Sequence, residues 1–159
     1  MGKIAFLFSG QGAQRPGMGL AWQGADPAAT AVFERAEALC PGVTALCVQA
    51  DAETLNETVN AQPSLFCMDL AAALALRKAG VRADCVAGFS LGEVPALAFA
   101  DMLSLEAAFR LVCLRAQAMQ DCARQHPGGM AAVLGLDNPA VERLCEGHAD
   151  LYPANYNCP

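Results

Sequence analysis

The segment Gly88-Phe89-Ser90-Leu91-Gly92-Glu93 constrains the fold of this chain more than any other stretch. It follows an apolar run at residues 85–87 and precedes the apolar residues 94–100, so it predicts a strand, a sharp turn and a helix in succession. A serine between two glycines at such a corner is typical of a nucleophile, because only small residues fit beside a strained turn. The corner also directs backbone N–H groups toward a developing oxyanion. We therefore expect an α/β fold that exposes Ser90, with a purely structural turn as the alternative.

The remaining pattern predicts two parts of unequal size. Residues 3–8 form a short apolar run that is typical of a buried parallel strand. Helices are expected over residues 30–39, 51–58, 63–78, 92–100 and 105–123, with Pro63 in a first turn and Ser104 as an N-cap. After His126 we expect a strand at 130–136, a helix at 138–146 and a strand at 151–157. The expected parts are residues 1–126 and 127–159.

Composition excludes several classes of function. The 159 residues are 55% hydrophobic and 16% charged, which indicates a globular chain with one well-filled core. The net charge of −6 leaves no basic stripe for nucleic acid. We find no signal peptide and no apolar run near the roughly 20 residues that span a bilayer, so we expect a cytoplasmic protein without a membrane partner. Eight cysteines without any Cys-x-x-Cys pair indicate free thiols in a reducing compartment and no metal site.

A glycine-rich loop follows the first expected strand. Gly10-Gln11-Gly12 begins like a dinucleotide-binding loop, but Arg15 stands where that fingerprint requires a third glycine. Gln11 between two glycines favours contact with a ligand through both its backbone and its amide. A flexible strand-to-helix connection is an equally good interpretation.

Arg115 lies at the edge of the apolar stripe of the helix expected over residues 105–123. One interpretation is a snorkelling arginine, whose stem covers apolar surface while its head stays in water. The other is a clamp for a carboxylate, because the guanidinium fork binds a carboxylate through two parallel hydrogen bonds.

A serine nucleophile needs a general base, normally histidine. The chain has two histidines, His126 before Pro-Gly-Gly and His148 after Gly147. We expect both to be solvated loop residues. The sequence therefore offers Ser90 no convincing base.

Six motifs together resemble one family. They are, in chain order, Gly10-Gln11-Gly12-Ala13-Gln14, Gln62-Pro63, the segment 88–93, Arg115 followed by Met119-Gln120, Gly129-Met130-Ala131-Ala132-Val133, and Asn155-Tyr156-Asn157-Cys158-Pro159. The ordered set is similar to the malonyl-CoA:acyl-carrier-protein transacylases of bacterial fatty acid synthesis, over essentially the whole chain. The resemblance implies an α/β-hydrolase-like large subdomain, incomplete here, and the start of a ferredoxin-like small subdomain from about residue 127.

The resemblance also implies a role for each site residue. Ser90 would take malonyl from malonyl-CoA and pass it to the phosphopantetheine thiol of acyl carrier protein. Gln11 and the backbone N–H of Leu91 would form the oxyanion hole, and Arg115 would pair with the malonyl carboxylate. No cofactor is implied beyond the substrate malonyl-CoA and the phosphopantetheine on the carrier protein.

The chain departs from the family pattern in two ways. Phe89 stands where the family has histidine, an auxiliary of the site rather than the base. The general-base histidine of the family comes after the position that corresponds to Pro159, so the resemblance implies an N-terminal half with the nucleophile but without the base. We therefore expect little or no transfer by the chain alone, and self-association or pairing with a C-terminal fragment.

Two other functions stay open on the sequence. One is transfer of another carboxylated acyl group, as in polyketide synthesis, and the other is a non-catalytic fragment that binds a thioester or a carrier protein. A serine hydrolase is disfavoured, because a clamp for malonate serves no purpose there.

Overall fold

The computed structural model describes residues 2–22, 24 and 26–157. Cys158 and Pro159, which end the last sequence motif, lie outside the described residues. The contacts divide the chain after His126 into a main unit and a second unit that begins at Pro127. Each unit is described by itself.

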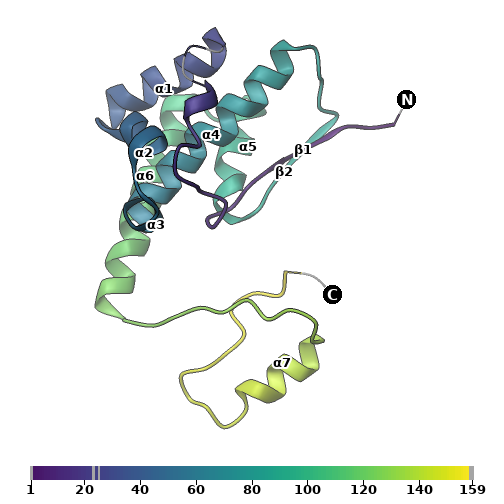
Figure 1. Ribbon diagram of the computed structural model, residues 1–159. Helices are drawn as coiled ribbons and strands as arrows, with labels where there is room; N and C mark the ends of the chain where they lie inside the picture. Colours follow the sequence, from purple (N-terminus) through teal and green to yellow (C-terminus); the bar gives the residue numbers. More distant parts are fainter. Residues whose placement is uncertain (1, 23, 25, 158–159) are drawn as a thin grey trace. The chain divides into compact units, whose positions relative to one another are not determined.

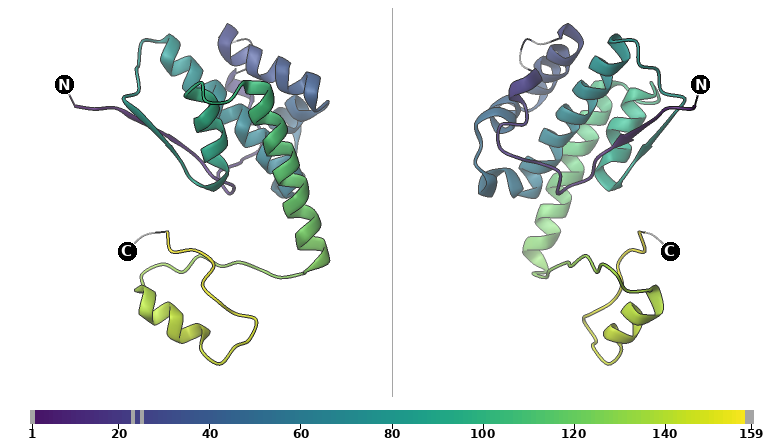
Figure 2. Two further views of the ribbon diagram at one scale, coloured as in Figure 1. Left: turned by 180° about the vertical axis from the view of Figure 1, so that it is seen from behind. Right: turned by 45° about the vertical axis from the view of Figure 1, so that its right-hand side comes forward.

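Two parallel strands form the sheet of the main unit, as the apolar runs predict. Strand β1 (Ala5–Phe8) pairs with β2 (Cys85–Gly88), and Phe8 lies opposite Gly88. Phe6 and Phe8 are buried and contact the ring of Phe99, whereas the alternate side chains of β1 are exposed. Figures 1 and 2 show the strand pair lying along one side of the helices.

Side chains cap the N-termini of three helices in the main unit. The helices are α1 (Pro27–Leu39), α2 (Val43–Gln49), α3 (Ala52–Asn56), α4 (Thr58–Lys78), α5 (Glu93–Phe99) and α6 (Leu105–Gln125), with 3₁₀ turns η1 (Leu20–Trp22) and η2 (Ser90–Gly92). Asp26, Asp51 and Ser104 accept hydrogen bonds from backbone N–H groups in the first turns of α1, α3 and α6. The predicted cap at Ser104 is confirmed.

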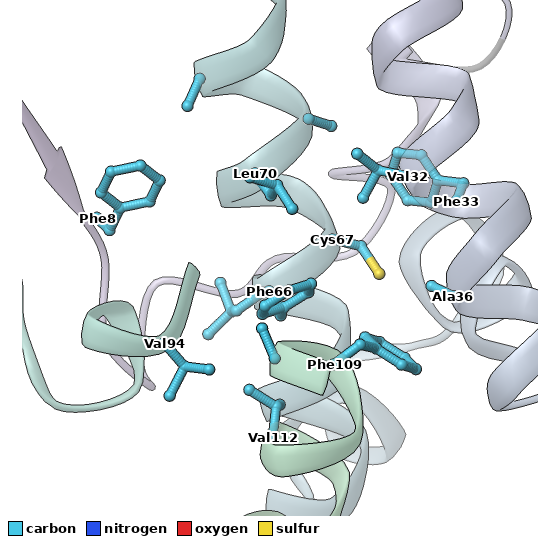
Figure 3. Packing of buried hydrophobic residues seen from close by; sticks show 14 of the residues in the cluster. Phe8, Val32, Phe33, Ala36, Phe66, Cys67, Leu70, Val94, Phe109 and Val112 are labelled. Atoms are coloured by element: carbon cyan, nitrogen blue, oxygen red, sulfur yellow. The ribbon is translucent and has the colours of Figure 1, made fainter. Parts of the chain in front are cut away.

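Helix α4 is the centre of the core. It contacts α1, α2, α3, α5 and α6, and Figure 3 shows Phe66, Cys67 and Leu70 of α4 packed among the side chains of α1 and α6. The rings of Phe66 and Phe109 meet edge to face, with centroids 5.5 Å apart.

The length and composition of α4 also match a membrane span, which the sequence analysis did not anticipate. Its 21 residues have a mean hydropathy of 1.3 over the best window, and 56% of that window is buried inside the protein. Because this burial is against the other helices of the unit, α4 has the surroundings of a core helix.

The expectation that Pro63 lies in the first turn of its helix is wrong. Helix α4 begins at Thr58, because the N–H groups of Asn60 and Ala61 already bond to the carbonyl of Glu57. Pro63 therefore lies inside the helix, where it removes one backbone hydrogen bond. Pro95, by contrast, occupies the first turn of α5 after Gly92.

The second unit contains one helix within the described residues. Helix α7 (Asn138–Cys145) forms where predicted, with Asp137 as its N-cap. The strands predicted at 130–136 and 151–157 do not form, so the β-α-β expectation is wrong. An extended segment becomes a strand only when a neighbour supplies ladder hydrogen bonds, and neither described segment has such a neighbour.

Candidate active site

Ser90 lies at a sharp corner between β2 and α5. Its φ of 54° is in the left-handed region, which non-glycine residues rarely adopt. A Cβ at Gly88 would collide with the backbone of Gly92 and Glu93, and a Cβ at Gly92 would collide with the carbonyls of Phe8 and Ser9. The two glycines therefore allow the corner to press against β1 while the side chain of Ser90 stays exposed.

Leu91 directly follows Ser90 in the chain, and Gln11 lies in the loop after β1. The side chain of Leu91 is completely buried, which fixes the backbone that follows Ser90 at the start of α5. Gln11 is exposed in the loop after β1, and its Nε2 donates to Thr58 Oγ1 at 3.2 Å. The loop meets the corner directly, because the Phe89 ring packs against Gly10 and the Phe89 N–H donates to the Phe8 carbonyl.

Arg115 reaches the corner from α6. Its Nη2 donates to Ser90 Oγ at 3.1 Å and its Nη1 donates to Gln62 Oε1 at 2.7 Å. Ala108, Val112 and Ala116 hold the same helix against the core, so the half-buried arginine leaves α6 at the edge of the buried stripe, as the periodicity predicts. The structure thus brings together three residues that lie far apart in the sequence: Gln11, Ser90 and Arg115.

Gln62 joins these residues, and the sequence analysis assigned it no role. It is completely buried on α4, and its Nε2 donates to Gln11 Oε1 at 3.2 Å. The available signal was a glutamine within a mostly apolar helix, since a long polar side chain on a buried face needs internal partners.

No side chain among the described residues accepts a hydrogen bond from Ser90 Oγ. Its hydrogen-bond partner among them is Arg115, which can only donate. His126 is exposed at the end of α6, roughly 16 Å along the helix axis from Arg115. His148 is exposed in the second unit.

Asp69 is a second buried polar group that the sequence analysis missed. It lies half-buried on α4 and accepts hydrogen bonds from Ser9 Oγ at 3.0 and 3.1 Å. Burial raises the pKa of this carboxyl to about 6, against the opposing effect of the Ser9 hydrogen bonds. Because Ser9 also places its carbonyl against Gly92, this carboxyl supports the base of the corner.

The cysteines and acidic residues form no metal centre in the described part of the chain. No group of three or more His, Cys, Asp or Glu side chains gathers there, and the seven described cysteines are free. Burial raises the pKa of Cys47 and of Cys113 to about 11 and that of Cys67 well above its usual value. These thiols are therefore neutral core residues near pH 7.

Comparison with known proteins gives a consistent family. The sequence profile described as the acyl transferase domain matches residues 5–159. The malonyl CoA-acyl carrier protein transacylase of Bacillus subtilis (strain 168) is 38% identical over 164 residues, covering 100% of this chain and 52% of that protein. The chain thus spans about half the length of the curated relatives that it matches.

Solved structures agree with this match. The malonyl CoA-acyl carrier protein transacylase from Clostridium perfringens has a TM-score of 0.82 and 35% identity, covering 91% of this chain and 46% of that one. A type II PKS acyl-carrier protein in complex with its malonyl-transacylase gives a TM-score of 0.79 and 34% identity, covering 91% and 47%. The profile match includes the Ser90 corner, the Gln11 loop and Arg115, and on that match the chain belongs to the acyl transferase domain family.

Proposed function

We propose that this chain carries the acyl-accepting site of a malonyltransferase. Ser90 Oγ attacks the thioester carbonyl of malonyl-CoA, the C–S bond breaks, and a malonyl ester forms on the serine while the hydroxyl proton is passed on to the departing coenzyme A sulfur. The ester then passes to the phosphopantetheine thiol of acyl carrier protein, which regenerates the serine. The observation that carries the proposal is the 3.1 Å hydrogen bond between Arg115 and Ser90, because it holds a cation next to the hydroxyl that receives the acyl group.

Arg115 favours an acyl chain with a carboxylate. A guanidinium has five N–H donors, and Ser90 and Gln62 occupy two of them among the described residues. In a malonyl ester only one methylene separates the carbonyl from the carboxylate, so a carboxylate attached at Ser90 stays within reach of the remaining donors. A neutral acyl chain would leave this charge unpaired.

Gln11 and the backbone N–H of Leu91 are the proposed oxyanion donors. Leu91 directly follows Ser90, and Gln11 is linked to Ser90 through the hydrogen bonds of Gln62 and Arg115. Malonyl-CoA and acyl carrier protein are the proposed substrate and partner, with the phosphopantetheine supplied by the carrier protein and no resident cofactor.

We propose that acylation of Ser90 is slow in this chain alone, since no described residue accepts its proton. A general base contributes about 10²–10⁴-fold to such a step. We also propose that the main unit is part of an α/β-hydrolase-like subdomain. A polypeptide that corresponds to the rest of the relatives' length completes the site in this proposal. We further propose that the protein acts in the cytoplasm.

The test is covalent labelling of the 159-residue chain with malonyl-CoA, read by intact mass and peptide mapping. We expect a slow malonyl adduct on Ser90 that is absent in Ser90→Ala. Arg115→Met should slow labelling by malonyl-CoA and leave the slower labelling by acetyl-CoA unchanged. Labelling elsewhere, or equal labelling of Ser90→Ala, would overturn the proposal.

One neighbour makes a second candidate worth testing. The neighbour described as a type II PKS acyl-carrier protein in complex with its malonyl-transacylase favours a polyketide carrier protein as the partner, with malonyl as the acyl group. Labelling with methylmalonyl-CoA beside malonyl-CoA distinguishes the acyl groups. Binding of malonyl-CoA without any Ser90 ester would instead favour the non-catalytic fragment.

A further inference from the structure

Gln62 makes hydrogen bonds to two of the proposed site residues from a position with no solvent exposure. Its Oε1 accepts from Arg115 Nη1, and its Nε2 donates to both Gln11 Oε1 and Met119 Sδ at 3.2 Å. All three of these contacts come from elements other than α4: the loop after β1 and helix α6. Gln62 thus connects the oxyanion side of the site to the carboxylate side.

The orientation of the Gln62 amide follows from chemistry. Arginine can only donate hydrogen bonds, so the group that faces Arg115 must be the amide oxygen. The amide nitrogen then faces Gln11 and Met119, both of which offer acceptors there. The flipped amide would set its nitrogen against the guanidinium and its oxygen against the Gln11 oxygen and the Met119 sulfur, which are three unfavourable contacts.

The orientation of Gln62 in turn sets that of Gln11. Because Gln62 donates to Gln11 Oε1, the Gln11 oxygen is occupied and its Nε2 is left to donate. One Nε2 hydrogen is directed to Thr58 Oγ1, and the second is free for another acceptor among the described contacts. A site that must stabilise an oxyanion needs such a donor, and the opposite orientation of Gln11 would present an oxygen instead.

We infer that Gln62 is a positioning residue. Its amide oxygen orients the Arg115 guanidinium, and its amide nitrogen holds Gln11 in the orientation in which Gln11 donates a hydrogen bond to the acyl oxyanion. This inference rests on the proposed function for its consequence in acyl transfer. The hydrogen-bond relay from Arg115 through Gln62 to Gln11 is a property of the chain itself and is testable without turnover.

Gln62→Glu removes the hydrogen-bond donor of this side chain and leaves its shape nearly unchanged. The carboxylate still accepts from Arg115, but it cannot donate to Gln11, so the Gln11 amide must turn its nitrogen toward Glu. We expect Ser90 labelling by malonyl-CoA and by acetyl-CoA to slow by up to the 10²–10³-fold associated with one oxyanion donor. The preference for malonyl over acetyl should also fall about tenfold, because the carboxylate neutralises Arg115.

Gln117→Glu is the matched control. It makes the same chemical change on an exposed side chain of α6, near Arg115 in sequence but bonded to Asp121. Gln62→Met removes all three hydrogen bonds at similar volume. If Gln62 only fills space, Gln62→Met should label as well as the unaltered chain once folded, and this result would overturn the inference.

Side-chain amide NMR of the ¹⁵N-glutamine-labelled chain separates this inference from the proposed function. We expect the Gln62 amide protons to exchange slowly, and the Gln11 amide signals to shift in Gln62→Glu but not in Gln117→Glu. Unchanged Gln11 signals in Gln62→Glu would overturn the relay. Shifted signals together with an unlabelled Ser90 in the unaltered chain would support the relay and contradict the malonyltransferase proposal.

Discussion

Ser90 has a backbone conformation that only its surroundings can maintain. A positive φ costs a non-glycine residue about 1–3 kcal/mol, so it persists only where the neighbouring structure maintains it. Here the neighbouring structure is the contact of Gly88 and Gly92 with the backbones of α5 and β1. The exposed hydroxyl and the two closely packed glycines beside it are therefore one structural feature.

Adding a methyl group at either glycine should open this corner. We expect Gly88→Ala and Gly92→Ala to lower the free energy of unfolding by about 2–4 kcal/mol, because the colliding atoms are backbone and cannot rotate away. Urea unfolding followed by circular dichroism measures the change. Gly129→Ala is the control, since a Cβ there meets nothing within 4 Å. Equal stabilities for all three variants would contradict the packing argument.

Asp69 should make stability depend on pH in an identifiable window. Its pKa rises from 3.8 to about 6 on folding, so between these values the folded chain binds more protons than the unfolded chain. The free energy of unfolding that this group contributes therefore falls as pH rises through that window.

Asp69→Asn isolates this contribution, because the amide keeps an acceptor for Ser9 and carries no charge. We expect the variant and the unaltered chain to have similar stability near pH 4, and the variant to become the more stable of the two above pH 6. The measurement is urea unfolding from pH 4 to pH 8, with the exposed change Asp150→Asn as control. A stability difference that does not vary with pH would show that Asp69 ionises normally.

Sequence reasoning selected chemically distinctive side chains and missed those that connect them. Gly-x-Ser-x-Gly is visible as a pattern and indicates Ser90, whereas the stripe edge left the role of Arg115 open and the family resemblance implied it. Gln62 and Asp69 belong to an apolar helix, where periodicity says that a face is buried but not which atoms it meets. Their partners lie more than 50 positions away, at Arg115 and Ser9 respectively.

At the level of elements, the sequence predicted the strands and helix caps that have a clear signal in neighbouring residues. The continuous apolar runs became β1 and β2, and the serine before Leu105 became the cap of α6. The start of α4 was placed too late because Pro63 is a strong first-turn signal, and the earlier turns at Thr58 carry none. The strands at 130–136 and 151–157 failed because a strand needs a partner that its own sequence does not specify.

The cap of α6 should matter to the main unit, since this helix carries Arg115 and buries Phe109. Ser104 Oγ accepts from the Ala107 N–H at 3.1 Å, and Ser104→Ala should lower the free energy of unfolding by about 1 kcal/mol. Asp137→Ala removes the equivalent cap from α7, which has no buried residues. Unfolding monitored by the near-ultraviolet signal of Trp22 should respond to the first change and not to the second. The reverse order would show that α7 contributes to the main core.

At the scale of the whole molecule, the strand pair of the main unit presents an unusual surface. The sheet has two strands in the described part of the chain, so each strand has an unpaired edge there. The outward residues include Ala5, Leu7 and Ala87, and Leu7 is 79% exposed. Parallel strands ordinarily have both faces covered, and exposed strand edges pair readily with other chains.

We therefore expect the chain to self-associate through this strand pair. In sedimentation equilibrium the average mass should rise with protein concentration. Reducing conditions keep the exposed Cys85 from forming a disulfide between chains. Leu7→Lys should shift the curve toward monomer, because it places a charge on the uncovered face, and edge lysines oppose strand pairing. Leu114→Lys, at a side chain of α6 that is 69% exposed, should leave the association unchanged. A chain that stays monomeric at every concentration would refute association altogether. If Leu114→Lys reduces the association and Leu7→Lys does not, the contact lies on α6, beside Arg115. Self-association would then compete with binding of the proposed substrate near Arg115.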